Sequence, residues 1–483
     1  MSQPHVVVIG GGIAGLAAAA FLSGAAGGSP RASVTLLEAA DRLGGKLQGG
    51  EVGGVRVDLG AESMLARRPE GVELAQEVGL ADFLEPPSTA KAAIWTRGAL
   101  RPLPGGQLMG VPGDLDALAA SGVLSPEGLR RAGAESTDGG AEGIGADEDV
   151  TIGEYVAARL GREVVDRLVE PLLGGVYAGH ADAISLRAAV PALLPLARSG
   201  GPLVEGVRAL AAKAGAAAGP VFQGLRGGIG TLPEAVAAAC AKAGVELRTG
   251  APVAELRRTP EGWRIVVDGE VLTADAVVLA VPAPQAARLL RPDAPGAAAE
   301  LSAVEYAGMA LVTMAFRRSD LTEPLTGSGF LVPPVDGHRI KASTFSSNKW
   351  GWLERAAPDA FLLRTSLGRQ GEEQVLGLSD DELLARSLAD LGEAVGLRAK
   401  PYDSAVTRWH GGLPQYPVGH LDRVARIREQ AERLGGLVLC GAAYDGVGIP
   451  ACIASARSAV GLLVDKVLAP PVGAPATEGT MSV

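Results

Sequence analysis

Cysteine, aromatic side chains, positive charge and long apolar runs are all scarce in this chain of 483 residues. The three cysteines are too few and too scattered for a disulfide framework or a metal site, so we expect a reducing, cytoplasmic compartment. The formal net charge of −10 predicts no nucleic-acid partner, because no broad basic field exists to release counterions from phosphates. No segment reaches the about 18 uninterrupted apolar residues of a transmembrane helix, which leaves only peripheral contact with the cytoplasmic membrane open.

The start of the chain carries its most informative pattern. An apolar run over 6–9, typical of a buried parallel strand, leads into a G-x-G-x-x-G sequence and then into an alanine-rich helix over 16–22. A second apolar strand over 34–37 ends in Glu38. We expect no secretion signal before this first strand. The order and spacing predict one strand-helix-strand unit that binds a dinucleotide.

Each residue type in this motif has a physical reason. Gly10 permits a tight turn, Gly12 lets the backbone approach a pyrophosphate, and Gly15 allows the helix to pack closely on the strand. The helix N-terminus offers free N–H groups to phosphate. Glu38 can accept hydrogen bonds from ribose hydroxyls and would repel a 2′-phosphate, which disfavours NADP and leaves NAD and FAD.

A second glycine pattern narrows the cofactor to FAD. Residues 42–46, RLGGK, resemble the glycine doublet of FAD-dependent amine oxidases, desaturases and protoporphyrinogen oxidases, which wraps the pyrophosphate. The resemblance places 60–63 along the isoalloxazine. It also places the turn 441–450 before a helix whose N-terminus stabilises reduced flavin. The residues expected to bind FAD are Gly10, Gly12, Ile13, Ala14, Gly15, Glu38, Ala39, Arg42, Gly44, Gly45, Lys46, Gly60, Ala61, Glu62, Ser63, Val253, Trp409, Gly441, Gly446, Val447, Gly448 and Ile449.

The predicted fold class is α/β with three units. They are a discontinuous Rossmann-like FAD-binding domain of the glutathione-reductase-2, p-hydroxybenzoate-hydroxylase-like class, a mixed-sheet substrate domain and a helical insertion domain. The predicted ranges are 1–65, 222–290 and 432–470 for FAD, 66–92 and 291–431 for substrate, 93–221 for the mostly helical domain, and 471–483 for a disordered tail. Within the helical domain, the acidic segment 132–149 has no core-forming residue beyond Ile144 and is predicted to be flexible.

Four separated segments resemble the HemY-type protoporphyrinogen/coproporphyrinogen oxidases, in the same order. The resemblance spans residues 4–468 apart from the acidic segment. The segments are 170–186 (EPLLGGVYAG followed by AISL), 344–350 (TFSSNKW), 408–416 (RWHGGLPQY) and 446–453 (GVGIPACI).

This resemblance implies a six-electron, oxygen-dependent aromatisation of a porphyrinogen in haem biosynthesis. Hydride passes from a meso-carbon to flavin N5 with loss of a pyrrole N–H proton, and O2 becomes H2O2 in each of three cycles. Flavin N5 is the acceptor, so we expect no catalytic side chain and no metal, and we expect the five histidines to be surface or packing residues. The candidate substrate contacts are Arg68, with Arg67 as its alternative, and Gly175; Lys349 and Arg364 are expected to be paired or surface charges.

Coproporphyrinogen III is the expected substrate and protoporphyrinogen IX the alternative. The chain is acidic and without a membrane-inserting stretch, which favours the more polar tetracarboxylate. Its composition is typical of a high-GC bacterium, and the family resemblance implies the coproporphyrin route, which such Gram-positive lineages often use. An amine oxidase or a carotenoid desaturase of the same fold is a further alternative, with Tyr444 and Trp409 able to imitate an amine oxidase's aromatic cage. The last alternative is a non-catalytic protein that binds FAD. Ferrochelatase is the expected downstream partner, and monomer and homodimer both stay open.

Overall fold

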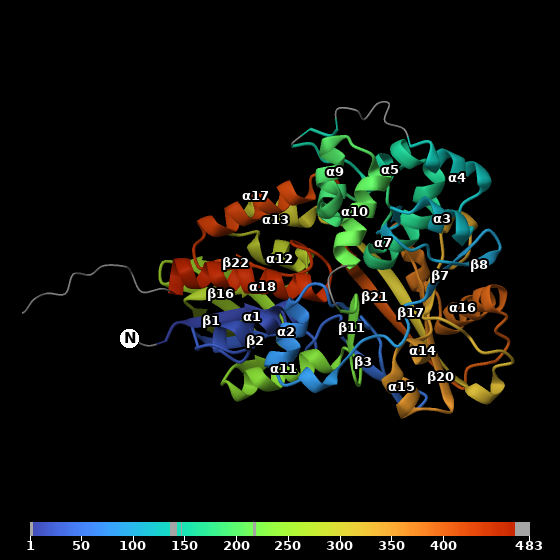
Figure 1. Ribbon diagram of the computed structural model, residues 1–483. Coiled ribbons are helices and arrows are strands. Elements are labelled where there is room, and N and C mark those ends of the chain that lie inside the picture. The colour runs from blue at the N-terminus through green and yellow to red at the C-terminus, as the bar shows by residue number, and fades with distance from the viewer. Residues whose placement is uncertain (1–2, 136–142, 146, 216–218, 469–483) are drawn as a thin grey trace, which may run out of the picture.

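The computed structural model describes residues 3–135, 143–145, 147–215 and 219–468 (Figure 1). Its nucleotide-binding unit is built on a parallel five-stranded sheet whose strands come from the beginning, the middle and the end of the chain. In sheet order these strands are β12 (Glu246–Arg248), β2 (Ser33–Leu37), β1 (His5–Ile9), β16 (Ala276–Leu279) and β22 (Leu437–Leu439).

Alternating side chains of β1 send apolar groups into two separate cores. Val6 and Val8 face one core and Val7 and Ile9 the other, as the period of two along a strand requires. The first core is covered by α1 (Ile13–Ser23), α11 (Thr231–Lys242), α18 (Ile449–Leu463) and α2 (Glu70–Glu77). The second is covered by α12 (Ala283–Leu290), α13 (Pro295–Ser302), α17 (His420–Arg433) and the antiparallel strands β13 (Val253–Thr259), β14 (Gly262–Val267) and β15 (Glu270–Ala274).

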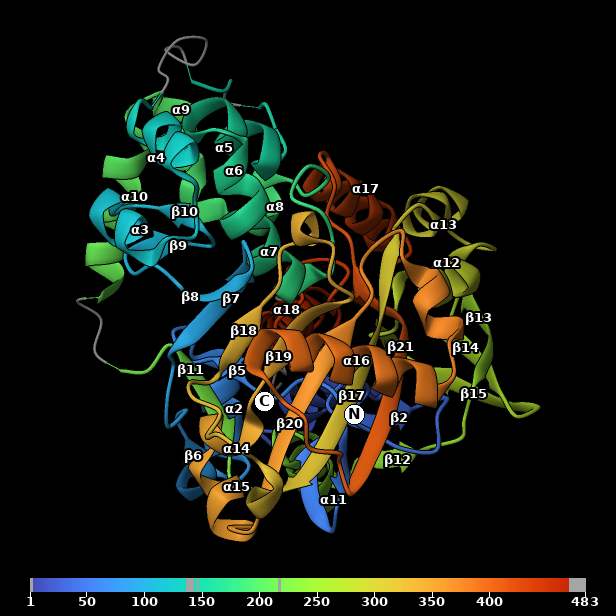
Figure 2. The same ribbon diagram turned by 90° about the vertical axis from the view of Figure 1, so that its right-hand side faces the viewer.

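A seven-stranded mixed sheet forms the second unit, and α16 (Asp380–Val395) lies across one face of it (Figure 2). Its order is β21 (Asp403–Pro414), β17 (Tyr306–Arg317), β20 (Ala360–Leu367), β19 (Ile340–Thr344), β18 (Gly329–Leu331), β7 (Ala92–Thr96) and β8 (Ala99–Pro102). The hairpin β7–β8 lies almost wholly within 93–221, which we predicted to be mostly helical. It extends the sheet instead, because β7 pairs in parallel with β18.

The remaining strands and several of the helices are short. The antiparallel pairs are β3 (Gly49–Val52) with β4 (Val55–Asp58), β11 (Phe222–Leu225) with β5 (Met64–Leu65) and β6 (Leu84–Glu85), and β9 (Gln107–Leu108) with β10 (Val111–Pro112). The short helices are α14 (Ser346–Lys349), α15 (Gly351–Ala356), η1 (Ala81–Phe83), η4 (Arg318–Asp320), η5 (Pro334–Asp336), η6 (Glu373–Gly377) and η7 (Val464–Leu468).

The third unit is helical and has its own apolar core (Figure 2). It comprises α3 (Leu115–Ser121), α4 (Pro126–Gly133), α5 (Ile152–Leu160), α6 (Arg162–Val164), η2 (Val165–Val169), α7 (Glu170–Tyr177), α8 (Leu186–Ala189), η3 (Pro191–Leu193), α9 (Leu194–Ser199) and α10 (Leu203–Gly215). Across the described parts of the chain, no helix is long and apolar enough to cross a bilayer.

The edges of the predicted flexible segment 132–149 are packed. Ala132 is fully buried at the end of α4, and Glu135 forms a buried ion pair with Arg159 at 2.7 Å. Asp149 accepts a hydrogen bond from the Ser185 hydroxyl at 2.7 Å. The side chains at both ends of the segment therefore have partners distant in the sequence. Its remainder, 136–142 and 146, lies outside the described residues, as does the predicted tail 471–483.

Candidate active site

The glycine-rich turn after β1 is crowded everywhere except at Gly12. A Cβ on Gly15 would lie 1.8 Å from the Gly10 carbonyl oxygen, and one on Gly10 would lie 2.5 Å from that of Ala280. A Cβ on Gly12 would meet no described atom within 4 Å. Gly12 is the N-cap of α1, and none of the side chains described caps it. The first turn of α1 therefore faces open space suited to a phosphate group.

Glu38 closes this turn from the side. Its Oε2 accepts the N–H of Gly11 at 2.6 Å, and its Oε1 accepts the N–H of Ala40 at 2.8 Å. Each carboxylate oxygen keeps a further lone pair, so hydrogen bonds from ribose hydroxyls remain possible. Ala39 beside it is exposed. The carboxylate thus shapes the loop as well as offering acceptors.

The glycine doublet lies directly against the first turn. The Gly44 N–H donates to the Gly11 carbonyl oxygen at 2.8 Å, with Gly44 at φ +101°. A Cβ on Gly45 would come within 3.2 Å of the Gly12 Cα. Arg42, predicted to bind the cofactor, donates to the Gly45 carbonyl oxygen at 2.7 Å, so its guanidinium braces the doublet.

Residues 60–63 run beside the doublet. The Ala61 N–H donates to the Lys46 carbonyl oxygen at 3.2 Å, and burial lowers the pKa of the Lys46 ammonium. A Cβ on Gly60 would lie 2.0 Å from that carbonyl oxygen and 3.2 Å from the Trp409 ring. The sheet of the second unit, through Trp409 of β21, therefore touches the segment predicted to line the isoalloxazine.

Glu62 is the centre of a buried ion network behind this segment. Its carboxylate accepts from Trp350 Nε1 at 2.8 Å, Arg364 Nε at 2.9 Å, Lys349 Nζ at 3.1 Å and Ser346 Oγ at 3.1 Å. Burial alone would raise the pKa of Glu62, but Arg364 and Lys349 outweigh burial and lower it to about 2. Arg364 also donates to the Gly60 carbonyl oxygen at 2.7 Å. The Glu62 side chain fixes residues 60–63 from behind, so only its backbone is left for the predicted cofactor contact.

The C-terminal turn meets the first motif in space. A Cβ on Gly441 would lie 3.9 Å from the Cβ of Ala14, and α18 packs along α1. Gly448 is the N-cap of α18, which like α1 has no capping bond from a described side chain, and Ile449 begins the helix with a buried side chain. The N-termini of α1 and α18, neither of them capped by a described side chain, therefore lie at the same side of the sheet.

The same turn also reaches the helical unit. The Gly446 N–H donates to the Tyr416 hydroxyl at 3.0 Å, and Val447 packs against the helical core. Tyr444 is 1% exposed and belongs to the core under the five-stranded sheet. It therefore cannot pair with Trp409 in an aromatic cage.

Three further residues were predicted to bind the cofactor or the substrate. Val253 is buried at the start of β13, where its carbonyl oxygen accepts from an arginine of α12. Arg68 pairs with Glu70 at 2.8 Å and is partly exposed. Gly175 is exposed on α7, and its Cβ would meet Leu331 at 3.7 Å.

Leu331 lies on the face of the seven-stranded sheet that is turned away from α16. It alternates along β18 with Phe330, which is 2% exposed in the core under α16, so Leu331 points to the opposite face. Lys341 of β19 is buried on this same side, where its Nζ lies 3.7 Å from the Met309 Sδ. Our sequence reasoning missed Lys341; its only signal was a lone lysine inside an otherwise uncharged strand.

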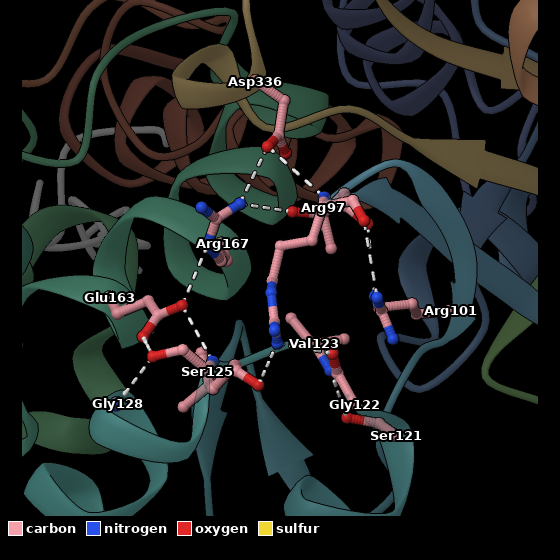
Figure 3. A network of polar contacts seen from close by, with 12 residues as sticks. Arg97, Arg101, Ser121, Gly122, Val123, Ser125, Gly128, Glu163, Arg167 and Asp336 are labelled. Atoms are coloured by element: carbon pink, nitrogen blue, oxygen red, sulfur yellow. Dashed lines mark hydrogen bonds and ion pairs between the residues drawn. The ribbon is translucent and has the colours of Figure 1, made fainter.

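A polar network fastens the helical unit to this sheet (Figure 3). Arg167 of η2 donates to Thr96 of β7 at 2.6 Å and pairs with Asp336 of η5 at 2.9 Å. It also pairs with Glu163 at 3.1 Å. The Arg97 guanidinium in the β7–β8 turn donates to carbonyl oxygens after α3. These bonds join η2, which leads directly into α7, to the sheet.

The fold and the glycine cradle formed by Gly12, Gly44 and Gly45 define a flavoprotein with a nucleotide-binding unit around the five-stranded sheet and a separate seven-stranded sheet. Residues 13–464 match the family described as flavin containing amine oxidoreductase, and the chain belongs to this family. FAD is its cofactor, and it is an FAD-dependent oxidoreductase.

Relatives across the full length have more specific names. The chain is 39% identical to a coproporphyrinogen III oxidase of Mycobacterium leprae, with 97% of this chain and 100% of that protein covered. It is 29% identical to a protoporphyrinogen oxidase of Bos taurus, covering 94% and 97%. A solved structure of a candidate protoporphyrinogen oxidase from Exiguobacterium sp. 255-15 superposes with a TM-score of 0.84 at 34% identity, covering 96% and 99%. The resemblance to the HemY-type oxidases is thereby confirmed.

Proposed function

We propose that the chain oxidises coproporphyrinogen III to coproporphyrin III in haem biosynthesis. The reaction removes six hydrogen atoms as six electrons and six protons, and three O2 become three H2O2. The observation that supports this proposal most directly is the full-length similarity to proteins that bear the name coproporphyrinogen III oxidase. FAD, when bound, supplies the two-electron acceptor at N5 that O2 can reoxidise.

In this proposal, the residues of the chain bind and orient the cofactor. Gly12 and the first turn of α1, with Gly44 and Gly45, receive the pyrophosphate, and Glu38 receives ribose hydroxyls. Residues 60–63 support the isoalloxazine, held from behind by the Glu62 network.

The substrate enters between α7 and the sheet face that carries Leu331. Gly175 is exposed and has no side chain, so it adds no bulk to this wall, which already comes within contact distance of Leu331. Arg68 can offer its guanidinium to a propionate, in competition with Glu70, which holds it at 2.8 Å.

Protoporphyrinogen IX is the second candidate substrate, favoured by the bovine relative's name. An amine as substrate is disfavoured, because Tyr444 is packed in the core and leaves Trp409 without an aromatic partner across the flavin.

The test is to purify the protein with FAD and supply coproporphyrinogen III and protoporphyrinogen IX separately under air. We expect porphyrin fluorescence to rise faster than autoxidation with both, and kcat/KM to be higher for coproporphyrinogen III. A rate at the autoxidation level with both substrates would refute the proposed function. A higher kcat/KM for protoporphyrinogen would instead reverse the choice of substrate.

The proposal extends to the cellular compartment, the downstream partner and the oligomeric state of the protein. All three cysteines, Cys240, Cys440 and Cys452, are free and buried, which fits a reducing cytoplasm. A ferrochelatase that takes up coproporphyrin III is the proposed downstream partner. Sedimentation of the holoenzyme with and without ferrochelatase tests both this contact and whether the enzyme is a monomer or a homodimer.

A further inference from the structure

Lys341 occupies an irregular position in the seven-stranded sheet. The pairing of β19 with β20 runs Ile340 with Leu367 and then Ala342 with Ser366, so Lys341 is the extra residue of a β-bulge. Ile340 is fully buried in the core under α16. The bulge therefore redirects the lysine side chain away from that core.

The contact with Met309 shows which face the side chain takes. Along β17, Ala310 belongs to the core under α16, so its neighbour Met309 points to the other face. Met309 pairs across the strands with Trp409, whose ring lies beside Gly60. Lys341 thus reaches toward the segment predicted to line the isoalloxazine.

On its other side, Lys341 adjoins the predicted macrocycle wall. Ala342, the next residue, pairs with Leu331 of β18, and Leu331 is the side chain that faces Gly175. Helix α7 packs on both β18 and β19. The lysine therefore lies between the two surfaces that would enclose a substrate.

The charges around Lys341 leave room for one more anion. No described carboxylate lies within 4 Å of its Nζ, which donates instead to the Met309 sulfur at 3.7 Å. Burial, and next the positive charge of Arg369, lower the pKa of Lys341 to about 7, while Glu372 acts in the opposite direction. Arg369 is itself buried, donates to a backbone carbonyl and lies 3.8 Å from Glu372.

Glu170 of α7, which acts on Arg369, already has a partner. It lies 2.8 Å from His180, and this contact raises the pKa of His180. Arg369 and the protonated Lys341 therefore share the Glu372 carboxylate as their counter-charge. A buried ammonium without a carboxylate is costly, so a bound anion here would be strongly favoured.

We propose that Lys341 is the receptor for a propionate carboxylate of the substrate. This inference rests on the proposed function, since it takes a carboxylate-bearing tetrapyrrole as the ligand. It adds a site to the candidate contacts Arg68 and Gly175, and it gives the buried lysine a partner that the folded chain does not provide. A charge-assisted hydrogen bond from Nζ would hold the carboxylate at the sheet side of the pocket.

The test compares Lys341→Met with the unchanged holoenzyme. Binding of coproporphyrin III is followed by absorbance titration, and KM and kcat are measured with coproporphyrinogen III. We expect the Kd and the KM to rise by about 10- to 100-fold, as the loss of one hydrogen bond to a charged group predicts, with kcat within about twofold. Lys341→Arg should retain most of the affinity. Lys400→Met removes one exposed lysine elsewhere and should change neither constant.

Two other outcomes would contradict the proposal. An unchanged Kd and KM in Lys341→Met would overturn the proposal. A fall in kcat with unchanged Kd would also overturn it, because the lysine would then handle a proton and not bind a carboxylate. If the unchanged enzyme oxidises no porphyrinogen, the proposed function fails, whereas loss of the Lys341 effect alone leaves that function standing.

Discussion

At the scale of single residues, the glycine cradle separates two roles that look alike in the motif. Gly15 is required by packing, because its Cβ would overlap the Gly10 carbonyl oxygen at 1.8 Å. Packing does not explain Gly12, because its Cβ would enter space that no described atom fills, at an ordinary φ of −70°, and we expect a ligand there. The two glycines should therefore fail in different ways when they are replaced.

We predict that Gly12→Ala folds normally and loses FAD, since the added methyl occupies the phosphate space. The apo protein should keep its Tm within about 2 °C, while the Kd for FAD rises at least about tenfold. Gly15→Ala should fail to give soluble protein, because the added methyl has no room between helix and strand. Thermal unfolding and fluorescence titration with FAD measure both. Equal FAD affinity in Gly12→Ala would contradict the cradle.

Glu62 is the second residue whose replacement gives a sharp prediction. Glu62→Gln leaves Arg364 and Lys349 buried without their anion, which should lower the free energy of unfolding by about 3–5 kcal/mol. The Ser346 and Trp350 donors still find an acceptor in the amide.

This loss should depend on pH with a definite sign. The folded pKa of Glu62, at about 2, is below its ordinary value of 4.5. Its stabilisation is therefore complete above pH 4.5 and is lost as pH falls through about 2. Urea unfolding should show the gap between the native protein and Glu62→Gln narrowing over this window. A gap that stays constant from pH 6 to pH 3 would mean that the ion pairs do not stabilise the fold.

At the scale of elements, Arg167 is one of the polar side chains that join the helical unit to the sheet. It connects η2 with both β7 and η5 (Figure 3), and its side chain is 17% exposed. Helix α7 follows η2 directly in the chain. A change at Arg167 should therefore be felt at Gly175.

We predict that Arg167→Met lowers the free energy of unfolding by about 1–3 kcal/mol and raises KM for the porphyrinogen more than it lowers kcat. The ion pair between Arg130 and Glu127 on α4 offers a matched control, because both side chains are more than 70% exposed. Arg130→Met should leave both quantities unchanged within error. An Arg167→Met enzyme with native KM would show that this network does not position α7.

Local sequence patterns predicted the strands that form the cradle. They could not predict contacts between residues that lie far apart in the sequence. The apolar runs before Gly10 and Glu38 are β1 and β2, because a strand buried on both faces needs apolar residues at every position. The role of Glu62 could not be read this way, since Trp350 and Arg364 lie almost 300 residues further along. Lys341 was missed because a bulge, which no local pattern announces, decides which face it takes.

At the scale of the whole molecule, the cradle joins parts of the chain that are far apart. Helix α1 follows the first strand, and α18 follows the last strand of the same sheet. A ligand that contacts both helix N-termini binds only when the beginning and the end of the chain are in place. FAD should therefore bind the folded chain and not the unfolded one.

We accordingly predict that FAD stabilises the entire protein and not one unit of it. Binding to the folded state alone adds RT ln(1 + [FAD]/Kd), or about 2.7 kcal/mol at 100 times the Kd, so Tm should rise with the logarithm of the FAD concentration. The rise should be seen equally by far-UV circular dichroism and by intrinsic tryptophan fluorescence, to which Trp95 of the seven-stranded sheet contributes from outside the cradle. In Gly12→Ala the concentration dependence should be displaced to higher FAD. If FAD moved only one probe, the sheets would unfold independently, and the cofactor would stabilise the nucleotide-binding unit alone.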